Sequence, residues 1–293
     1  MKISEILKFN KPTISFEVFP PKNESALESI KAATEEIASL SPAFMSVTYG
    51  AGGGTSRYTT RIAENIEKRF GVPTLAHLTC VSSTRATVGE RIADMKAAGI
   101  KNVMALRGDI PAEMENVGGG EWDYRYAFEL VRELRESGGD FCIGGACYPE
   151  VHPESRSQDE DLIHLKHKVE SGCDFLTTQM FFDNELYFSF VDKALGVGID
   201  VPIIPGVMPI TNANQIERVV NLSGSYMPRK FLSIVDRFGD DPSTMEEAGI
   251  AYAIDQVRDL YLRGVTNVHI YSMNKPRVAR AILNNLSDIL KND

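Results

Sequence analysis

The sequence predicts a single α/β domain of the (β/α)8, or TIM, barrel class, with a helical insertion before the eighth strand. Eight strand-like segments alternate with amphipathic segments, and most strand-to-strand intervals are about 30 residues, the length of one βαβ unit. Such alternation implies a parallel sheet, and eight units favour its closure into a barrel. No linker or low-complexity tract divides the chain, so residues 1–293 are predicted to form one domain.

The strand candidates share short runs of β-branched, aromatic and other apolar residues. They begin near Thr13, Phe44, Pro73, Asn102, Phe141, Phe175, Val201 and Asn267. The helical candidates share apolar residues at helical spacing. They are expected over residues 27–40, 55–70, 84–98, 123–137, 156–171, 184–195, 212–222 and 276–290. Several end at a glycine just before the next strand, which suits the left-handed conformation that often closes a helix.

The interval before the eighth strand is longer than the others. Residues 223–244 are rich in Gly, Pro and acidic residues, and a helical run follows from Met245 to Leu262. We interpret this stretch as an insertion between the seventh and eighth strands, not as a second domain.

Composition excludes several classes of protein. Hydrophobic residues make up 43% of the chain and charged residues 24%, which is typical of a globular protein with a sizeable core. The net charge of −9 and the lack of a Lys/Arg run argue against nucleic-acid binding. Without a signal-like N-terminus or an apolar run of roughly 18 residues, a cytoplasmic protein without membrane partners is expected. The scattered cysteines, without a C-x-x-C motif, fit buried, reduced thiols.

The first strand, Thr13 to Pro21, places a carboxylate on a barrel's inner face. Ile14, Phe16 and Val18 share the parity that packs under helices, whereas Glu17 has the opposite parity, near the strand's C-terminal end. Apolar neighbours solvate a carboxylate poorly and tend to raise its pKa. We therefore expect Glu17 to point into the barrel mouth and to act as a proton source.

The same parity rule predicts that polar groups gather at the late, inward positions of other strands. These groups are Thr48, His77, Arg107, Asp109, Tyr148 and Gln179, with Arg107 and Asp109 assigned through their shared parity with Val103 and Ala105. Because the active sites of such barrels lie at the carboxyl ends of the strands, this mouth is the predicted site of chemistry.

Two glycine-containing motifs follow strands. Gly50 to Gly54 lacks the third glycine of the dinucleotide-binding G-x-G-x-x-G pattern, so it is interpreted as a flexible loop that a ligand can approach closely. In Arg107-Gly108-Asp109, the glycine would let the backbone approach a ligand while the charged residues contact its polar parts. A purely structural Arg107–Asp109 ion pair is the alternative.

The segment Tyr148-Pro-Glu-Val-His-Pro-Glu154 follows the fifth strand. Its prolines indicate a rigid loop that presents Tyr148 and His152 to a ligand. A metal site that includes His77 is the alternative, but no cluster has the spacing of zinc ligands, and no metal is predicted.

A polar stripe follows on the next helix. Asp161, His164 and Lys168 share one helical face. This face is either solvated or a binding surface for ribose or phosphate.

Eight fragments in order resemble the bacterial single-domain methylenetetrahydrofolate reductases. They are Ser15-Phe-Glu-Val-Phe-Pro-Pro21, Ser46-Val-Thr-Tyr-Gly-Ala51, Ala76-His-Leu-Thr-Cys80, Ala105-Leu-Arg-Gly-Asp109, Tyr148-Pro-Glu-Val-His-Pro-Glu154, Thr178-Gln-Met-Phe-Phe-Asp183, Ile204-Pro-Gly-Val-Met-Pro209 and His269-Ile-Tyr-Ser-Met-Asn274. The resemblance implies a TIM barrel that holds FAD without a Rossmann domain. It further implies ping-pong hydride transfer: NADH or NADPH reduces the flavin, and methylenetetrahydrofolate then becomes methyltetrahydrofolate, which supplies methyl groups for methionine synthesis.

The resemblance also assigns roles to individual residues. Glu17 matches the general acid, Asp109 the carboxylate beside the flavin and pterin, and Thr48 a contact on the nicotinamide side. The substrate-binding positions fall on Glu17, Gln179, Gln215 and Lys275. The flavin-binding positions fall on Tyr49, Ala51, His77, Arg107, Gly108, Asp109, Tyr126, Ala127, Tyr148, His152, Asp161, His164, His167 and Lys168.

Three of these positions depart from the family pattern. His164 stands where Asn is expected and His167 where Arg is expected, both on the helix that would meet the flavin's ribose and diphosphate. The two histidines would make flavin affinity depend on pH near 6 to 7. Lys275 replaces an Arg that typically meets the folate tail, although Arg277 is close by, and Lys lacks the planar fork of Arg.

Two other functions remain open at the level of sequence. One is a pterin-binding methyltransferase or lyase that uses Glu17 and Asp109 without flavin, and the other is a non-catalytic folate or flavin carrier. The family precedent is a homo-oligomer. No ribose-reading Asp or Arg distinguishes NADH from NADPH.

Overall fold

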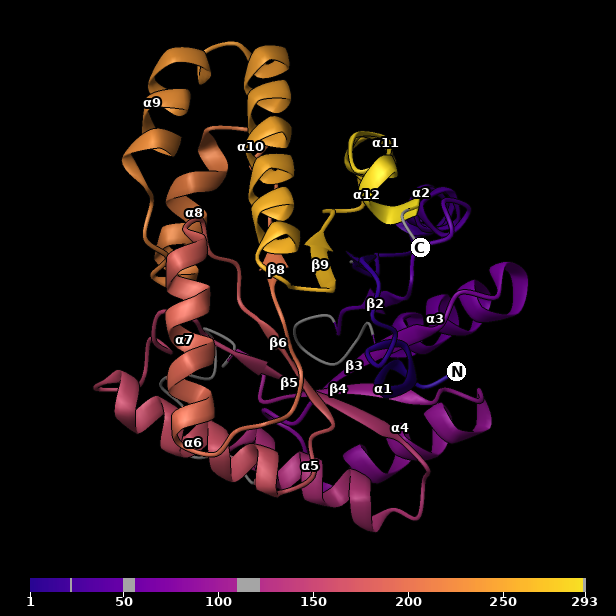
Figure 1. Ribbon diagram of the computed structural model, residues 1–293. Helices are drawn as coiled ribbons and strands as arrows, with labels where there is room; N and C mark the ends of the chain where they lie inside the picture. The colour runs from indigo at the N-terminus through magenta and orange to yellow at the C-terminus, as the bar shows by residue number, and fades with distance from the viewer. Residues whose placement is uncertain (22, 50–55, 110–121, 292–293) are drawn as a thin grey trace.

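The computed structural model describes residues 1–21, 23–49, 56–109 and 122–291, and these residues form a closed parallel barrel. Its strands are β1 (Thr13–Val18), β2 (Met45–Val47), β3 (Thr74–Thr79), β4 (Asn102–Leu106), β5 (Cys142–Cys147), β6 (Phe175–Thr178), β7 (Ile203–Ile204), β8 (Gly206–Val207) and β9 (Asn267–Tyr271). Their order is β7-β6-β5-β4-β3-β2-β1-β9-β8. Because only Pro205 separates β7 from β8 along the chain, the two ends of this order meet and the barrel closes. Figure 1 shows the strands β2 to β6, β8 and β9 enclosed by helices.

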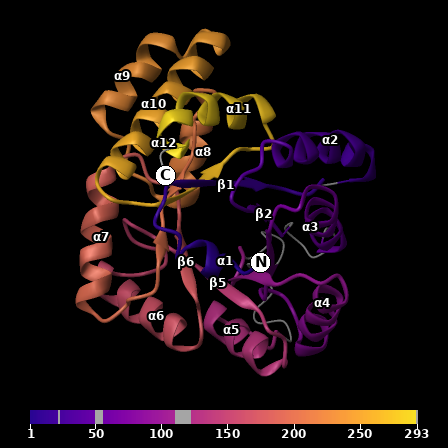
Figure 2. The same cartoon turned by 45° about the vertical axis from the view of Figure 1, so that its right-hand side comes forward.

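Helices surround the strands, as the alternation predicted. They are α2 (Leu27–Ala38), α3 (Ser56–Phe70), α4 (Arg85–Ala97), α5 (Ala127–Glu136), α6 (Gln158–Glu170), α7 (Asn184–Gly196), α8 (Asn214–Ser223), α11 (Pro276–Asn285) and α12 (Ser287–Lys291), with a 3-10 turn, η1 (Glu24–Ala26), before α2. Figure 2 shows them as a ring outside the strands. The predicted (β/α)8 barrel is therefore confirmed.

The predicted seventh strand is broken in two at Pro205. Proline has no N–H to donate, but its carbonyl accepts a hydrogen bond from the His269 N–H at 2.9 Å. The Gly206 N–H donates to Thr178 Oγ1 at 2.8 Å. A Cβ on Gly206 would lie 2.5 Å from the Thr178 carbonyl oxygen, so glycine is required where the chain changes its pairing partner from β6 to β9.

A short helix that the sequence did not predict, α1 (Ile3–Ile6), closes the amino end of the barrel. The Ile3 N–H donates to Asn102 Oδ1 at 2.8 Å, and α1 lies inside the ring of outer helices in Figure 2. Its isoleucines join an inner cluster of Ile3, Ile6, Phe44, Leu75, Met104, Cys142, Phe175 and Ile204. This inner cluster fills the amino half of the barrel.

Side-chain parity is confirmed for β1 and wrong for β4. Phe16 and Val18 pack outward in the main core, which leaves Glu17 on the inner face. On β4, however, Val103 and Ala105 face the outer core and Met104 faces the inner cluster. Arg107 and Asp109 therefore do not reach the mouth by strand parity. They follow the end of β4, where Gly108 takes a φ of +88° and redirects the chain.

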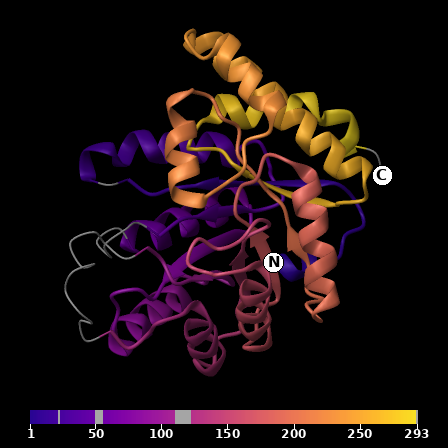
Figure 3. The ribbon, with the colours of Figure 1, turned by 90° about the vertical axis from the view of Figure 1, so that its left-hand side faces the viewer.

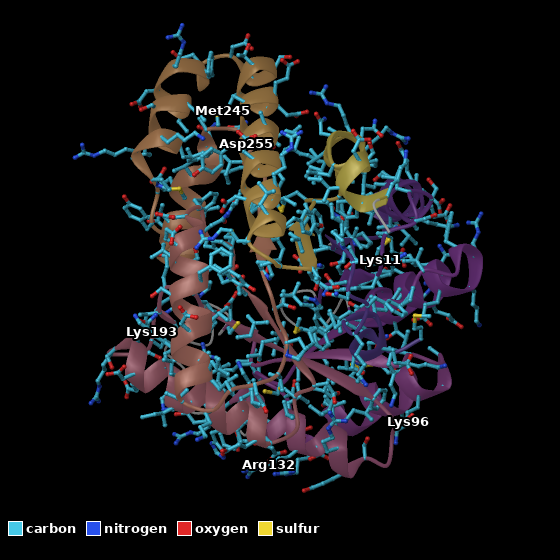
Figure 4. All side chains as sticks on the ribbon, in the orientation of Figure 1. Lys11, Lys96, Arg132, Lys193, Met245 and Asp255 are labelled. Atoms are coloured by element: carbon cyan, nitrogen blue, oxygen red, sulfur yellow. The ribbon has the colours of Figure 1, made fainter. Side chains whose placement is uncertain are left out.

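The insertion before β9 is a pair of packed helices, α9 (Arg229–Phe238) and α10 (Pro242–Leu262), which extends beyond the ring of helices in Figures 1 and 3. The sequence predicted a helix only from Met245 onward, so α9 was missed. Asp241 caps α10 by accepting from the Thr244 N–H at 2.7 Å. Met245 is fully buried in a cluster with Phe231 and lies between the two helices in Figure 4.

The polar surface lies on the outer helices. Lys96, Arg132 and Lys193 project from the outside of the barrel in Figure 4. All four cysteines are buried and free, as the sequence predicted. Among the residues with described positions, no helix is both long enough and apolar enough to cross a bilayer.

Candidate active site

A cavity of about 1040 Å³ opens at the carboxyl ends of the barrel strands. Most of the site residues predicted from the sequence line it: Glu17, Thr48, Tyr49, His77, Arg107, Gly108, Asp109, Tyr126, Ala127, Tyr148, His152, Asp161, His164, His167, Lys168 and Gln179. Gln215 and Lys275 do not line it, and Ala51 lies outside the described residues. The volume suits a ligand of cofactor size.

Glu17 is the acidic group at the base of this cavity. Its Oε2 lies 3.8 Å from His77 Nε2 and accepts a long hydrogen bond of 3.5 Å from Ser46 Oγ. Only 22% of the Glu17 side chain is exposed. Burial outweighs the Ser46 hydrogen bond and raises the pKa of Glu17 to about 8, so the carboxyl holds a proton near neutral pH.

His269, on β9, links two serines beneath Glu17. Ser46 Oγ lies 3.0 Å from its Nε2 and Ser15 Oγ lies 2.7 Å from its Nδ1. The ring stacks on Phe44, with centroids 5.5 Å apart. Burial lowers the pKa of His269 to about 3, so the imidazole is neutral and can accept at one nitrogen while it donates at the other.

His77 is a second neutral imidazole, because burial lowers its pKa to about 3. Among the described residues, its buried Nε2 has no hydrogen-bond partner, and neither does the buried Thr177 Oγ1. Both residues line the cavity. Because buried polar atoms are rarely left without partners, these two atoms are placed to bond a ligand or water in the cavity.

Arg107 forms its ion pair with Glu154, and not with Asp109 as the structural alternative supposed. The pair is bidentate, with N–O distances of 2.5 and 2.6 Å. It raises the pKa of Arg107 and lowers that of Glu154. A Cβ at Gly108 would lie 2.9 Å from Val81 Cγ1, so the positive φ and the close packing both require glycine there.

The loop after β5 is joined to α6 by hydrogen bonds to Asp161. The Asp161 carboxylate accepts from the His152 N–H at 3.1 Å and from Ser155 Oγ at 3.3 Å. The rings of Tyr148 and His152 meet edge-on, with centroids 4.6 Å apart. Burial raises the pKa of Tyr148 to about 12, so it presents a neutral hydroxyl.

The two unexpected histidines lie on the outer rim of the cavity. Both His164 and His167 are exposed on α6. Arg132 approaches His167 Nε2 at 2.9 Å, and the Phe128 ring lies 4.3 Å from the His167 ring. Tyr126, which is 55% exposed, stacks on Phe128. The rim thus combines aromatic surfaces with cations.

Gln215 and Lys275 form a second polar group. Lys275 Nζ donates to Thr211 Oγ1 at 2.6 Å. Gln215 Oε1 accepts from the Thr211 N–H at 2.9 Å and the Asn212 N–H at 3.1 Å. The Gln215 amide oxygen is therefore engaged in holding the backbone, and its amide nitrogen is the group left to contact a substrate.

Sequence reasoning missed several polar residues that line the cavity, among them Thr177 as a site residue, His269 and Tyr271. Tyr271 donates from its hydroxyl to the Thr178 carbonyl at 2.5 Å. The signal was available, since His269 and Tyr271 share the inward parity of the eighth predicted strand.

The residues present fit a large anionic cofactor with aromatic rings. Arg107, Lys168 and the rim histidines supply positive charge or hydrogen-bond donors. At Gly108 the backbone itself forms part of the cavity wall. The buried Nε2 of His77 has no hydrogen-bond partner among the described residues. No cluster of three metal-ligating side chains occurs within residues 1–21, 23–49, 56–109 and 122–291.

Barrel enzymes carry their catalytic residues at the carboxyl ends of the strands. This chain has the same arrangement, because its cavity opens at that end and holds the protonated side chain of Glu17. The family can be named from sequence. The sequence matches the methylenetetrahydrofolate reductase family over residues 2–287, and the chain belongs to that family. It is therefore an oxidoreductase of one-carbon metabolism that acts on a folate.

Relatives with established names support this assignment. The chain is 39% identical to a 5,10-methylenetetrahydrofolate reductase of Pectobacterium carotovorum, over 93% of this chain and 89% of that protein. It is 37% identical to the Escherichia coli enzyme of the same name, with 93% and 90% covered. It is 32% identical to methylenetetrahydrofolate reductase (NADH) 1 of Arabidopsis thaliana, over 97% of this chain and 50% of that protein.

Solved structures support the fold. An uncharacterized protein from Clostridium thermocellum that binds two copies of 5-methyl-5,6,7,8-tetrahydrofolic acid superposes with a TM-score of 0.65, 14% identity and 99% of both chains covered. Oxaloacetate acetylhydrolase superposes with a TM-score of 0.54 and 12% identity, over 99% of this chain and 86% of that one. At such identities the likeness concerns the barrel alone.

Proposed function

We propose that the chain reduces 5,10-methylenetetrahydrofolate to 5-methyltetrahydrofolate with NADH or NADPH as electron donor, FAD as cofactor and Glu17 as general acid. The two substrates would react in turn at one face of the flavin, in a ping-pong sequence. The observation that carries the proposal is Glu17, a carboxyl that holds a proton near neutral pH at the base of a cavity of cofactor size.

The whole chain would act as a single flavin-binding domain. This fits the cavity, because residues on or just after most of the barrel strands line it. Arg107, Gly108, His152 and Lys168 would hold FAD, together with the other cavity residues that the family resemblance assigns. When bound, the cofactor would accept a hydride from the nicotinamide and return one to the folate. The protein contributes binding, orientation and the exclusion of water.

Glu17 would protonate the nitrogen that leaves when the methylene bridge of the folate opens. Opening that bridge without a proton donor would produce a poor, anionic leaving group. A positioned acid contributes typically about 10²- to 10⁴-fold to such a step, most effectively when its pKa is near the working pH. The neutral His77 and His269 leave Glu17 as the proton donor at the base of the cavity.

Asp109 and Gln179, which also line the cavity, would contact the substrate there. Asp109 is exposed at the cavity, where its negative charge would stabilise a cationic iminium formed on the folate. Gln179 lines the cavity with an amide. Lys275 and the Gln215 amide nitrogen, which lie outside the cavity, would meet the charged tail of the folate. Following the family precedent, we also propose a homo-oligomer.

An anaerobic two-step titration tests the proposal. Purified protein is expected to be yellow, to bleach with NADH or NADPH, and to regain its colour with methylenetetrahydrofolate. Glu17→Gln should bleach as the parent does but lose about 10²- to 10⁴-fold in the rate of recolouring. Glu64→Gln, on the outer helix α3 and paired with Lys68, is the matched control and should behave as the parent.

Each other result contradicts part of the proposal. Protein that binds no flavin would favour the methyltransferase or lyase without flavin. Flavin that bleaches but is never reoxidised by the folate would favour a carrier. An equal loss in both half-reactions of Glu17→Gln would show that Glu17 is not the general acid.

A further inference from the structure

The turn that follows β9 has an unusual backbone. Met273 and Asn274 both have a φ of +53°, and the Lys275 N–H donates to the Ser272 carbonyl at 3.0 Å. Two successive residues with positive φ inside such a hydrogen bond define a type I′ turn. Asn tolerates this conformation, but Met does not favour it. A tight turn with this sequence therefore persists because its surroundings hold it.

The side chains of this turn form hydrogen bonds with the end of β1. Asn274 Oδ1 accepts from the Phe19 N–H at 2.9 Å, and Asn274 Nδ2 donates to the Phe19 carbonyl at 2.9 Å. Ser272 Oγ donates to the Glu17 carbonyl at 2.6 Å. The side-chain amide of Asn274 thus pairs with Phe19 as a neighbouring strand would.

These contacts continue the sheet where its backbone pairing stops. The last register pair between β1 and β9 is Glu17 with Tyr271. Beyond it, Phe19 is followed by Pro20 and Pro21, which have no N–H to donate. Without the side chains of the turn, the end of β1 beyond Glu17 would lack its hydrogen bonds to β9.

We propose that Asn274 is a positioning residue which, together with Ser272, fixes the end of β1 and so holds the Glu17 carboxyl in place for proton transfer. This inference rests on the proposed role of Glu17 as general acid. The same turn continues into Lys275, whose Nζ donates to Thr211 Oγ1. One turn therefore positions both Glu17, the proposed proton donor, and Lys275, a predicted contact of the folate tail.

The position of β1 matters to Glu17 because uncharged groups surround it. Ser46 from β2, His77 from β3 and Tyr271 from β9 lie next to Glu17, and His269 from β9 lies behind Ser46. Burial keeps both imidazoles and the Tyr271 phenol neutral. The proton affinity of Glu17 therefore depends mainly on how well water is excluded. A looser strand end admits water and weakens that affinity.

Two glycine variants separate the effect of the Asn274 hydrogen bonds to Phe19 from the effect of the positive φ angles in the turn. Asn274→Gly removes both hydrogen bonds to Phe19 but keeps the positive φ accessible. Met273→Gly relaxes the neighbouring residue and removes no hydrogen bond to β1, so it is the matched control. In flavin-loaded protein we expect Asn274→Gly to slow the folate half-reaction by about 10- to 100-fold, as a small misplacement of a reacting group does, and to leave nicotinamide oxidation unchanged.

A second measurement does not depend on turnover. The carboxyl of Glu17 can be titrated by ¹³C NMR and identified as the signal that Glu17→Gln lacks. In Asn274→Gly its midpoint should move down toward the ordinary carboxyl range, while in Met273→Gly it should stay at the parent value.

The outcomes separate this inference from the proposed function. An unchanged Glu17 midpoint in Asn274→Gly overturns the positioning role, even if thermal stability and both half-reactions fall together, because that pattern indicates a purely structural residue. If Glu17→Gln still reduces the folate, the general-acid proposal fails instead, whatever Asn274→Gly does.

Discussion

The Glu17 carboxyl holds its proton more tightly in the folded chain than in the unfolded one, since burial raises its pKa from 4.5 to about 8. Between these values the folded protein binds more protons, so the free energy of unfolding falls as the pH rises, by up to about 1.4 kcal/mol per pH unit. Glu17→Gln removes this pH-dependent fall in the free energy of unfolding, because Gln does not titrate. We expect the variant to become progressively more stable than the parent from about pH 5 to 8, as measured by urea unfolding. If the unfolding free energies of the parent and of Glu17→Gln changed with pH in parallel, the pKa of Glu17 would not be raised in the folded protein.

Single residues were predictable wherever a regular strand carried them. Parity placed Glu17 and His77 correctly, because alternation along a strand fixes which face a side chain occupies. It failed for Arg107, whose approach to the cavity depends on the positive φ of Gly108 after the strand has ended. The Arg107–Glu154 pair was also out of reach, since it joins two loops far apart in sequence.

At the scale of elements, one helix glycine decides how α10 packs. A Cβ on Gly249 would lie 1.7 Å from the Ile210 carbonyl oxygen, so Gly249→Ala must push α10 away from the segment that follows β8. We expect a loss of about 1–3 kcal/mol in unfolding free energy, as overpacking usually causes. Gly89→Ala on α4, where an added Cβ would meet no atom outside its own helix backbone within 4 Å, should instead gain about 0.5–1 kcal/mol.

Chemical denaturation of the two variants checks this contrast. The substitution is identical and both sites are helical, so only the surroundings differ. A Gly249→Ala protein as stable as Gly89→Ala would mean that α10 does not approach Ile210 closely.

Elements were predictable from periodicity, and their exceptions have local causes. The break at Pro205 follows from a missing N–H, which the strand pattern of the segment concealed. The helix α1 is only four residues long, and it is stabilised by burying Ile3 and Ile6 in the inner cluster, not by an amphipathic repeat. The helix α9 was hidden by the Gly, Pro and acidic residues around it, although Phe231 anchors it to α10.

At the scale of the whole molecule, the cavity collects residues from both ends of the chain. Glu17 stands on the first strand and Tyr271 on the last, and β1 pairs directly with β9. Spacing along the sequence predicts that strand ends meet, because closure of the barrel requires it. It does not predict which side chains then pair across the mouth, since that depends on loop geometry.

Because the cavity draws on most of the strands, a cofactor that fills it should stabilise the entire barrel. FAD at 100 times its dissociation constant would add about 2.7 kcal/mol to the unfolding free energy. If Arg107 holds it, Arg107→Met should shrink this gain. Arg263→Met is the matched control, because Arg263 makes a similar bidentate pair with Glu185, at 2.5 and 3.3 Å, away from the cavity. Arg107→Met loses one ion pair and Arg263→Met loses two, because Arg263 also lies 3.7 Å from Asp259, and such surface pairs contribute little to stability.

Thermal unfolding of the flavin-free proteins, with and without FAD, measures these gains. The parent and Arg263→Met should rise equally in melting temperature, and Arg107→Met should rise less. Equal gains in all three proteins would remove Arg107 from the cofactor site, and no gain in any of them would contradict the binding of FAD itself. The comparison isolates cofactor binding from catalysis, since no substrate is present and each variant is judged against its own flavin-free form.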